Sequence, residues 1–319
     1  MFKSVVLHNN FLTLVCINYG AIIHKLVTKD KHEKPVNVVI GFKTAEDYTA
    51  NPYFLGASLG RYAGRISGGG FNIDSTFYPI YSPGGVHLHG GVKTFSHQFW
   101  DIEDVTEGTN PSVTMCYNSP HLEEGYPGNL KAKVTYQLIE NTLKITYTAT
   151  TDRPTAVNLT NHSYFNLNGG GNILNHNLFL AADGFLALDE HHLPKGTLLP
   201  VSGSSFDFRK SRKIGSHPNF TGIDDCFPLL RKSPAAWLYS EESGIAMKVA
   251  TNQPSLVIFT PQQLPEANYN QKKAGRFCSI CFEAQNYPDA PNQPHFPSAL
   301  LNPGELYVNE TSFQFSVLS

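Results

Sequence analysis

Histidine is the residue type with most to offer chemically, because the chain has 13 histidines but only 16% charged residues. His162 lies in the stretch 158–167, where amides and hydroxyls stand among apolar residues. An imidazole gives or takes a proton near pH 7, so His162 is a candidate general acid or base. The same stretch could instead be a strand-end turn whose side chains cap backbone groups. The residues alone leave both interpretations open.

Two further histidines, His87 and His89, are separated by a single leucine. The period of two in a strand predicts that both lie on one face, where they could be metal ligands. Metal-binding cupins follow such a pair with a glutamate, whereas Gly90–Thr94 supplies no carboxylate. We therefore expect no metal here. One histidine should belong to a site and the other should be a hydrogen-bonded structural residue.

Three charged residues complete the candidate chemistry. Glu283 follows an apolar strand, and burial there would raise its pKa toward the range of a general base. The alternative is a solvated strand edge. Arg65 and Asp224 are candidates for binding polar groups, although each could simply belong to a surface ion pair. Together with the many aromatic residues of the chain, these candidate residues suit a neutral polyhydroxylated ligand such as a sugar. The residue types alone predict no more specific ligand.

Several classes of function are disfavoured. The chain has no GxxxxGK[ST] motif, so no phosphate loop is expected, and no nucleophile elbow is expected either. A net charge of -2 leaves no basic field for nucleic acid. No apolar run approaches the length of a membrane span, so no membrane partner is expected. The five cysteines, an odd number, favour a reducing, cytoplasmic location, and Cys278 and Cys281 read as apolar fillers rather than zinc or redox ligands.

The elements that must position these residues are predicted to be strands. Low charge, 26 Gly, 21 Pro and 36 Phe and Tyr favour turns and aromatic strands over helices. Alternation over 130–138 and 143–149 predicts a long antiparallel hairpin. A short helical turn is expected only at Thr44–Tyr48. The prediction is an all-β fold, a large antiparallel β-sandwich in which residues 1–319 form a single domain. Further strands are predicted at 11–17, 36–42, 113–117, 245–249, 256–259, 278–283 and 313–317.

Five motifs in this order resemble the aldose 1-epimerase (galactose mutarotase) family. They are GRYAGRI, HLHGG, NLTNHSYFNLNG, FDFR with GIDDCF, and the block from FEAQNYPDAPNQP to LLNPGE. Together they cover nearly the whole chain. The resemblance implies a single large β-sandwich, often called a supersandwich, which agrees with the strand pattern.

The family resemblance also implies a mechanism. Glu283 matches the catalytic base that removes the proton of the C1 hydroxyl, and His162 matches the acid that protonates the ring oxygen. Arg65, His89 and Asp224 match residues that bind the sugar. No metal or cofactor is implied, and the partner is a small sugar. Because ring closure reverses ring opening, each catalytic group needs a pKa near working pH, and we expect a raised pKa for Glu283 and a near-ordinary one for His162.

The chain departs from the family pattern at the pocket wall. Gly64 replaces an asparagine that contacts substrate in many members, Asp225 replaces a frequent histidine, and Val257–Thr260 replaces a strand that commonly holds a glutamine. None of these touches the expected acid–base pair. They bear on sugar preference, so the preferred aldose and whether the protein is a monomer or a homodimer remain open.

Two other functions fit part of the sequence. A hexose-6-phosphate 1-epimerase of related fold would need a cationic pocket, for which Arg209–Lys213 is the only basic cluster. A non-catalytic sugar-binding or sensing module would have no use for both Glu283 and His162. Interconversion of the α and β anomers of a free aldohexose, of galactose or glucose type, is the function that the sequence favours.

Overall fold

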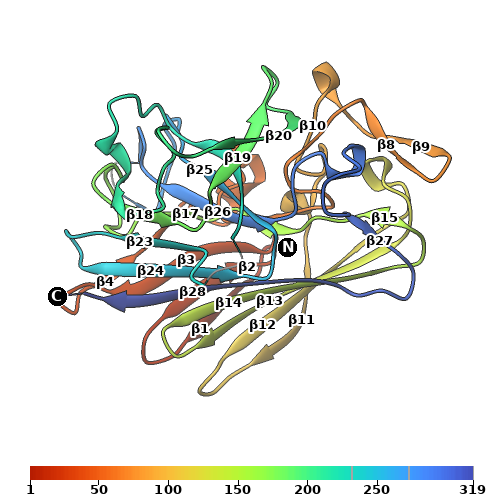
Figure 1. Ribbon diagram of the computed structural model, residues 1–319. Helices are drawn as coiled ribbons and strands as arrows, with labels where there is room; N and C mark the ends of the chain where they lie inside the picture. Colours follow the sequence, from red (N-terminus) through yellow and green to blue (C-terminus); the bar gives the residue numbers. More distant parts are fainter. Residues whose placement is uncertain (231–232, 272–273, 319) are drawn as a thin grey trace.

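The structure is a computed structural model that describes residues 1–230, 233–271 and 274–318. Its largest sheet has nine strands, every neighbouring pair of which is antiparallel (Figure 1). The last long strand lies inside this sheet rather than at its edge. In spatial order the strands are β11 (Asp101–Thr106), β12 (Ser112–Ser119), β13 (Leu130–Ile139), β14 (Thr142–Thr151), β28 (Tyr307–Val317), β24 (Ile245–Thr251), β23 (Ala236–Tyr239), β18 (Asn177–Leu180) and β21 (Arg212–Lys213).

A five-stranded antiparallel sheet lies against the large one and carries the residues of interest (Figure 1). Its order is β22 (Asp224–Pro228), β25 (Ser255–Phe259), β26 (Ile280–Gln285), β17 (Tyr164–Phe165) and β5 (Val39–Ile40). A four-stranded sheet follows the order β1 (Ser4–His8), β2 (Thr13–Ile17), β3 (Ile22–Lys29) and β4 (Pro35–Asn37). Two-stranded pairs are β6 (Ser58–Leu59) with β16 (Thr160–Asn161), β7 (Arg65–Ile66) with β10 (His87–Leu88), β8 (Gly70–Ile73) with β9 (Thr76–Pro79), β15 (Thr155–Ala156) with β27 (Leu300–Leu301), and β19 (Gly184–Leu188) with β20 (Pro194–Pro200).

The predicted hairpin is the clearest link from sequence to structure. In β13, the residues at every second position from Leu130 to Leu138 are buried, and those between them are at least partly exposed. β14 pairs with β13 from Ile139↔Thr142 to Leu130↔Thr151. Alternation of this kind buries one face of a sheet and leaves the other to solvent. The all-β antiparallel sandwich predicted from the sequence is confirmed.

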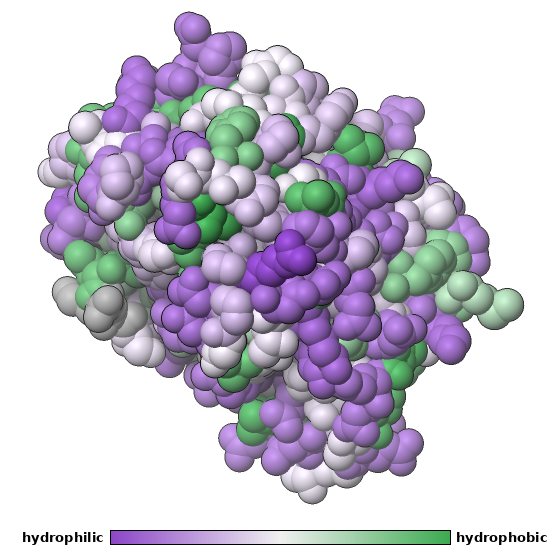
Figure 2. All heavy atoms as spheres, turned by 90° about the vertical axis from the view of Figure 1, so that its right-hand side faces the viewer, coloured by the Kyte–Doolittle hydropathy of each residue, from purple (hydrophilic) through white to green (hydrophobic). Residues whose placement is uncertain are grey.

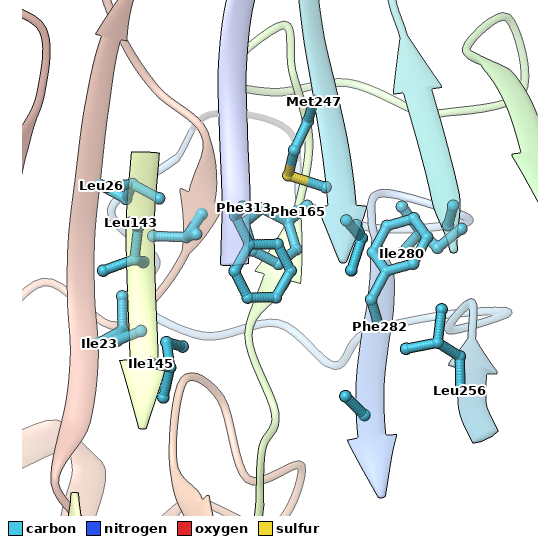
Figure 3. Packing of buried hydrophobic residues seen from close by; sticks show 14 of the residues in the cluster. Ile23, Leu26, Leu143, Ile145, Phe165, Met247, Leu256, Ile280, Phe282 and Phe313 are labelled. Atoms are coloured by element: carbon cyan, nitrogen blue, oxygen red, sulfur yellow. The ribbon is translucent and has the colours of Figure 1, made fainter. Parts of the chain in front are cut away.

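The main core lies between the nine-stranded and five-stranded sheets (Figure 3). Leu143 and Phe313 come from the large sheet, whereas Phe165 and Phe282 come from the smaller one. The rings of Phe165 and Phe313 meet across the layers with centroids 5.0 Å apart. Burying such side chains contributes roughly 1.5–3 kcal/mol each, so the smaller sheet is held firmly on its inner face.

Helical structure is confined to short turns in the described ranges. The turn expected at Thr44–Tyr48 is a 3-10 helix, Glu46–Ala50, with the ring of Tyr48 fully buried. Nowhere in the described chain is a helix long and apolar enough to cross a membrane. Figure 2 shows one face of the molecule, where hydrophilic side chains predominate and apolar ones form small separate patches.

Two strand predictions need correction. The strand expected over 36–42 is divided into β4 and β5, because the Asn37 side chain accepts from the Leu26 N–H and donates to the Val39 carbonyl, replacing ladder bonds. The strand expected over 278–283 starts two residues later, at Ile280, after Phe277 takes a positive φ of 46°. The second shift places both Glu283 and Gln285 within β26.

Candidate active site

The outer face of the five-stranded sheet forms the floor of a cavity of about 280 Å³. Along β26, Ile280, Phe282 and Ala284 point into the main core, so Glu283 and Gln285 face the opposite side and line the cavity. The same alternation in β25 sends Leu256 and Ile258 inward and Val257 and Phe259 to the cavity. One packed sheet therefore provides both the core wall and the site floor.

Glu283 is buried, with 2% of its surface exposed. Burial is the main cause that raises its pKa to about 8, the Asp224 carboxylate raises it further, and the Arg65 cation acts in the opposite direction. One carboxylate oxygen, Oε2, has no hydrogen-bond partner in the described chain. The solvated strand edge is thus excluded, and the raised pKa expected from an apolar strand is confirmed.

His162 lies between β16 and β17, at the edge of the same floor. Its N–H donates to the Ala57 carbonyl (2.9 Å), and its carbonyl accepts from the Gly56 N–H (3.0 Å). The imidazole stacks on the Tyr164 ring at 5.0 Å between centroids. Burial lowers the pKa of His162 to about 4. The expectation of a near-ordinary pKa is wrong, because the sequence does not reveal that the imidazole is 5% exposed.

The two groups face each other closely: His162 Nε2 lies 3.4 Å from Glu283 Oε1. The pKa of Glu283 is raised and the pKa of His162 is lowered. Between about pH 4 and pH 8 the two side chains together therefore carry one proton. A pair that holds one proton in a water-poor cavity can take a proton from one oxygen and give one to another nearby.

The antiparallel pair of β7 and β10 places Arg65 and His89 on the wall of the cavity. Arg65 pairs with Leu88 across the two strands, and the His89 N–H donates to the Gly64 carbonyl (2.9 Å). The Gly64 N–H in turn donates to His89 Nδ1 (3.1 Å). Burial lowers the pKa of His89 well below its ordinary value, and the neighbouring His162, Arg65 and His87 lower it further. A neutral imidazole that accepts at Nδ1 carries its proton on Nε2, so His89 is held as an N–H donor.

This tautomer also bears on metal binding. One ligand atom each from His89, His162 and Glu283 lies within 4.8 Å of the others, a spacing that could hold an ion. A metal ligand needs a free lone pair, and in His89 the Nδ1 lone pair already accepts from Gly64 while Nε2 carries the proton. The donor set therefore fits a metal poorly and fits hydroxyl groups well.

Asp224, the first residue of β22, lines the cavity from the edge strand of the same five-stranded sheet. Its Oδ2 is 3.7 Å from Arg65 Nη2 and 3.8 Å from His192 Nδ1. The side chains of Arg65 and Asp224 are 26% and 36% exposed, so the ion pair is reachable from solvent. All five residues singled out in the sequence, Arg65, His89, His162, Asp224 and Glu283, line this one cavity.

The two histidines of the HxH motif have separate environments, so the expectation of a shared strand face is wrong. The strand ends at Leu88, and His89 turns away with φ +48°. His87 is fully buried, with Nε2 2.7 Å from the Tyr126 hydroxyl and Nδ1 2.7 Å from the Tyr81 carbonyl. One histidine at the site and one structural histidine is the division that we expected.

The departures from the family pattern lie on the cavity wall. Gly64, Asp225, Val257 and Phe259 all line it. The expectation that none of them touches the acid–base pair is wrong, because Val257 pairs with Glu283 across the β25–β26 ladder and the Phe259 ring meets the His162 ring edge-on at 6.0 Å between centroids. Gly64 has φ +84°, and a Cβ there would lie 3.2 Å from Gln285 Nε2. Burial raises the pKa of Asp225 to about 6.

Sequence reasoning missed several lining residues. Tyr53 and Phe54 come from the turn after the 3-10 helix Glu46–Ala50, and His192 comes from the β19–β20 connection. The Phe54 ring meets His89 edge-on at 4.9 Å between centroids. Only the crowding of aromatics in NPYF hinted at Tyr53 and Phe54, and no periodicity points to His192.

The basic cluster lies elsewhere. Arg209 pairs with Asp207 through two bonds of 2.8 and 2.7 Å, and Arg212 donates to backbone carbonyls. These residues line a separate hollow, and Arg65 is the one Lys or Arg among the described residues around the cavity. Cys278 and Cys281 are buried free thiols, as expected for apolar fillers.

An all-β sandwich whose cavity holds a close His–Glu pair beside an Arg–Asp pair has the geometry expected of a carbohydrate isomerase, and the comparisons agree on that class. The family model described as aldose 1-epimerase matches residues 3–314. The galactose mutarotase of Sus scrofa is 38% identical over 98% of this chain and 93% of that protein. The aldose 1-epimerase of Escherichia coli K12 is 32% identical over 98% of this chain and 95% of that protein. A solved aldose epimerase homologue from C. elegans superposes with a TM-score of 0.93, at 28% identity over the full length of both chains.

The chain belongs to the aldose 1-epimerase family. It is an isomerase that interconverts the anomers of an aldose, and its substrate is a small sugar.

Proposed function

We propose that the protein interconverts the α and β anomers of a free aldohexose of galactose or glucose type, with Glu283 as general base and His162 as general acid. The observation that carries this assignment is the 3.4 Å separation of His162 Nε2 and Glu283 Oε1. The C1 hydroxyl and the ring oxygen of a pyranose are bonded to the same carbon. A base for one and an acid for the other must therefore lie close together.

The proposed ring opening moves one proton through the pair. Glu283 takes the proton of the C1 hydroxyl, the C1–O5 bond breaks as the C1 carbonyl forms, and His162 Nε2 donates a proton to O5. Rotation about C1–C2 presents the other face of the aldehyde. Closure reverses the transfers: His162 takes its proton back as O5 attacks C1, and Glu283 returns its proton to O1.

Because the pKa of Glu283 is raised and the pKa of His162 is lowered, the shared proton favours Glu283. This is the arrangement needed for ring closure. A cyclic sugar that donates its C1 hydroxyl to Glu283 and accepts at O5 from His162 favours the other arrangement. Arg65 supports the carboxylate form, because its cation opposes the rise in the pKa of Glu283. The pair can thus serve both directions with a small change in proton position.

Three residues are proposed to hold the sugar. His89 offers a fixed N–H donor, and the Arg65–Asp224 pair offers donors and acceptors to neighbouring hydroxyls. No metal or cofactor takes part in the proposed steps. We further propose that residues 1–319 act as one domain, as a monomer or homodimer, and that the buried free cysteines suit a cytoplasmic location.

Polarimetry on freshly dissolved α-D-galactose and α-D-glucose tests this proposal. We expect faster mutarotation than in buffer, no effect of a chelator, and loss of activity in Glu283→Gln while the sugar still binds. A wild-type protein that binds sugar but only matches buffer would be a non-catalytic module. Activity confined to sugar 6-phosphates would favour the phosphate-specific enzyme, and inhibition by chelator would call for a metal.

A further inference from the structure

The turn after β10 carries His89, and a carboxylate from outside the cavity holds this turn in place. Glu124 Oε2 accepts a hydrogen bond from the Val92 N–H (2.9 Å), and Glu124 Oε1 accepts one from the Lys93 N–H (2.8 Å). Bonds of this kind, to an ionised acceptor, are stronger than those between neutral groups. Glu124 does not line the cavity, so its contacts act on the turn rather than on the sugar.

The turn contains two glycines and an unusual backbone, so it depends on contacts from outside. His89 has φ +48°, and Gly90 and Gly91 have φ +92° and +110°. Adjacent glycines restrict a backbone little, and a histidine with positive φ is held there by its surroundings. A Cβ on Gly91 would overlap the Glu124 carboxylate, so glycine is required for this close approach. The glycines that admit the carboxylate would therefore leave the turn flexible without it.

Glu124 belongs to a loop, residues 119–127, that is itself firmly anchored. The buried guanidinium of Arg61 donates to carbonyls at the two ends of this loop. These carbonyls belong to Ser119 (2.9 Å), Pro120 (2.7 Å) and Pro127 (2.9 Å). A guanidinium is a planar group with its donors in a fixed arrangement, so bonds to several carbonyls hold the loop in one geometry. Glu124 thus presents its carboxylate from a rigid support.

The other end of the turn is bonded to the cavity wall. The His89 N–H donates to the Gly64 carbonyl (2.9 Å), and the Gly64 N–H donates to His89 Nδ1 (3.1 Å). These two bonds keep the proton of the imidazole on Nε2 only while the backbone of His89 stays where it is. Gly64 therefore fixes one side of the imidazole, and Glu124 fixes the turn that follows it.

We propose that Glu124 is a positioning residue for the isomerisation: it fixes the turn after β10 and thereby keeps the His89 N–H donor in place for the sugar. The inference rests on the proposed role of His89 in holding the sugar. Glu124 takes part in no proton transfer and touches no reacting atom. It acts through two backbone N–H groups, three and four residues beyond His89.

Polarimetric kinetics on α-D-galactose measure the effect of Glu124. A donor that holds the sugar equally in the ground state and the transition state lowers KM and leaves kcat unchanged. Glu124→Ala should therefore lower kcat/KM about tenfold, mainly through KM, with kcat within about threefold of the wild type. Glu124→Gln keeps one acceptor oxygen and should lie between the two. Glu107→Ala, at an exposed glutamate, is the matched control and should equal the wild type. An unchanged kcat/KM in Glu124→Ala, or a loss confined to kcat, overturns the proposal.

A double-mutant cycle with His89→Phe tests whether Glu124 acts through His89. When one residue acts only through another, the effects of the two substitutions do not add. In the His89→Phe protein, Glu124→Ala should lower kcat/KM by less than about twofold, because the donor that it positions is gone. A further loss of about tenfold there would show an independent effect of Glu124 and overturn the proposal. Full activity in His89→Phe would also overturn it, while leaving the assignment of Glu283 and His162 standing.

A measurement without turnover separates this inference from the proposed function. Nitrogen NMR of the imidazole rings shows which ring nitrogen carries the proton, and the His89→Phe protein identifies the signals of His89. In the wild type these signals should be those of a single tautomer with its proton on Nε2. In Glu124→Ala they should move toward a mixture of the two tautomers, and signals identical to the wild type overturn the proposal. A wild type that only matches buffer in polarimetry would refute the acid–base function, and the NMR signals would still decide the role of Glu124.

Discussion

Replacing Glu283 by glutamine should abolish catalysis and make the folded protein more stable at neutral pH. The carboxyl is 2% exposed, and its pKa is raised from 4.5 to about 8. A group with a raised folded-state pKa favours folding most below its unfolded pKa, and this contribution is lost as the pH rises through the folded pKa. Between about pH 4.5 and pH 8 the folded protein keeps a proton on Glu283 that the unfolded chain has released, so the wild type loses stability progressively over this range.

The size of this effect follows from the pKa difference. At about 1.36 kcal/mol per pKa unit, the cost reaches an upper limit of about 5 kcal/mol well above pH 8 and is about 3 kcal/mol at pH 7. Between pH 5 and pH 8 it grows by about 3 kcal/mol. Glutamine has a similar shape and no titration. If the glutamine amide has no hydrogen-bond partner, it lowers the free energy of unfolding of the variant by about 1–3 kcal/mol, and this cost does not change with pH.

The assay is reversible urea unfolding of the wild type and Glu283→Gln at pH 5, 6, 7 and 8, with the free energy of unfolding taken by linear extrapolation. The free energy of unfolding of Glu283→Gln should increase steadily relative to that of the wild type as the pH rises. Glu107→Gln, at an exposed glutamate, is the matched control and should show little change with pH. A difference between Glu283→Gln and wild type that stays constant from pH 5 to pH 8 would refute the argument that desolvation raises this pKa.

Three further predictions concern the titration of the pair and the roles of the two motif histidines. The pH profile of kcat/KM should be bell-shaped with limbs near pH 4 and pH 8, because one proton on the Glu283–His162 pair is needed; a profile flat from pH 5 to pH 10 would contradict this. Asp224→Asn should move the alkaline limb to lower pH, since the Asp224 carboxylate raises the pKa of Glu283; movement to higher pH would reverse the assigned sign. His87→Phe should lower the free energy of unfolding by about 2 kcal/mol, because its two partners are left unpaired, and should keep kcat/KM within about threefold of the wild type. His89→Phe should lower kcat/KM at least tenfold. Comparable losses of kcat/KM in both variants would contradict the separate roles of the two histidines.

The sequence predicted the fold well where one physical signal dominates. Strict alternation over residues 130–149 gave the hairpin and its buried face, since a strand with one buried face has a period of two. Very short strands such as β7 and β17 were not predicted, because two residues cannot display a period. They are held in place by tertiary contacts instead.

The five candidate site residues were singled out through their chemistry and their family resemblance, and all of them line one cavity, whereas their electrostatics depend on packing. Glu283 follows a visibly apolar strand, so its raised pKa could be predicted. The lowered pKa of His162 comes from burial under Tyr164 and neighbouring loops, which converge from distant parts of the chain. His192 reaches Asp224 from a separate hairpin, and only three-dimensional contact shows it.

The interior position of β28 has a consequence for the order of folding. This strand bridges β14 and β24, so the two halves of the nine-stranded sheet are joined only when residues 307–317 take their place. The catalytic floor rests on that sheet through Phe313 and Phe165. During synthesis, activity should therefore emerge late and abruptly, after the ribosome has released these residues. A long-range pairing of this kind is slow to form, so the edges of β14 and β24 should stay unpaired until residues 307–317 are in place.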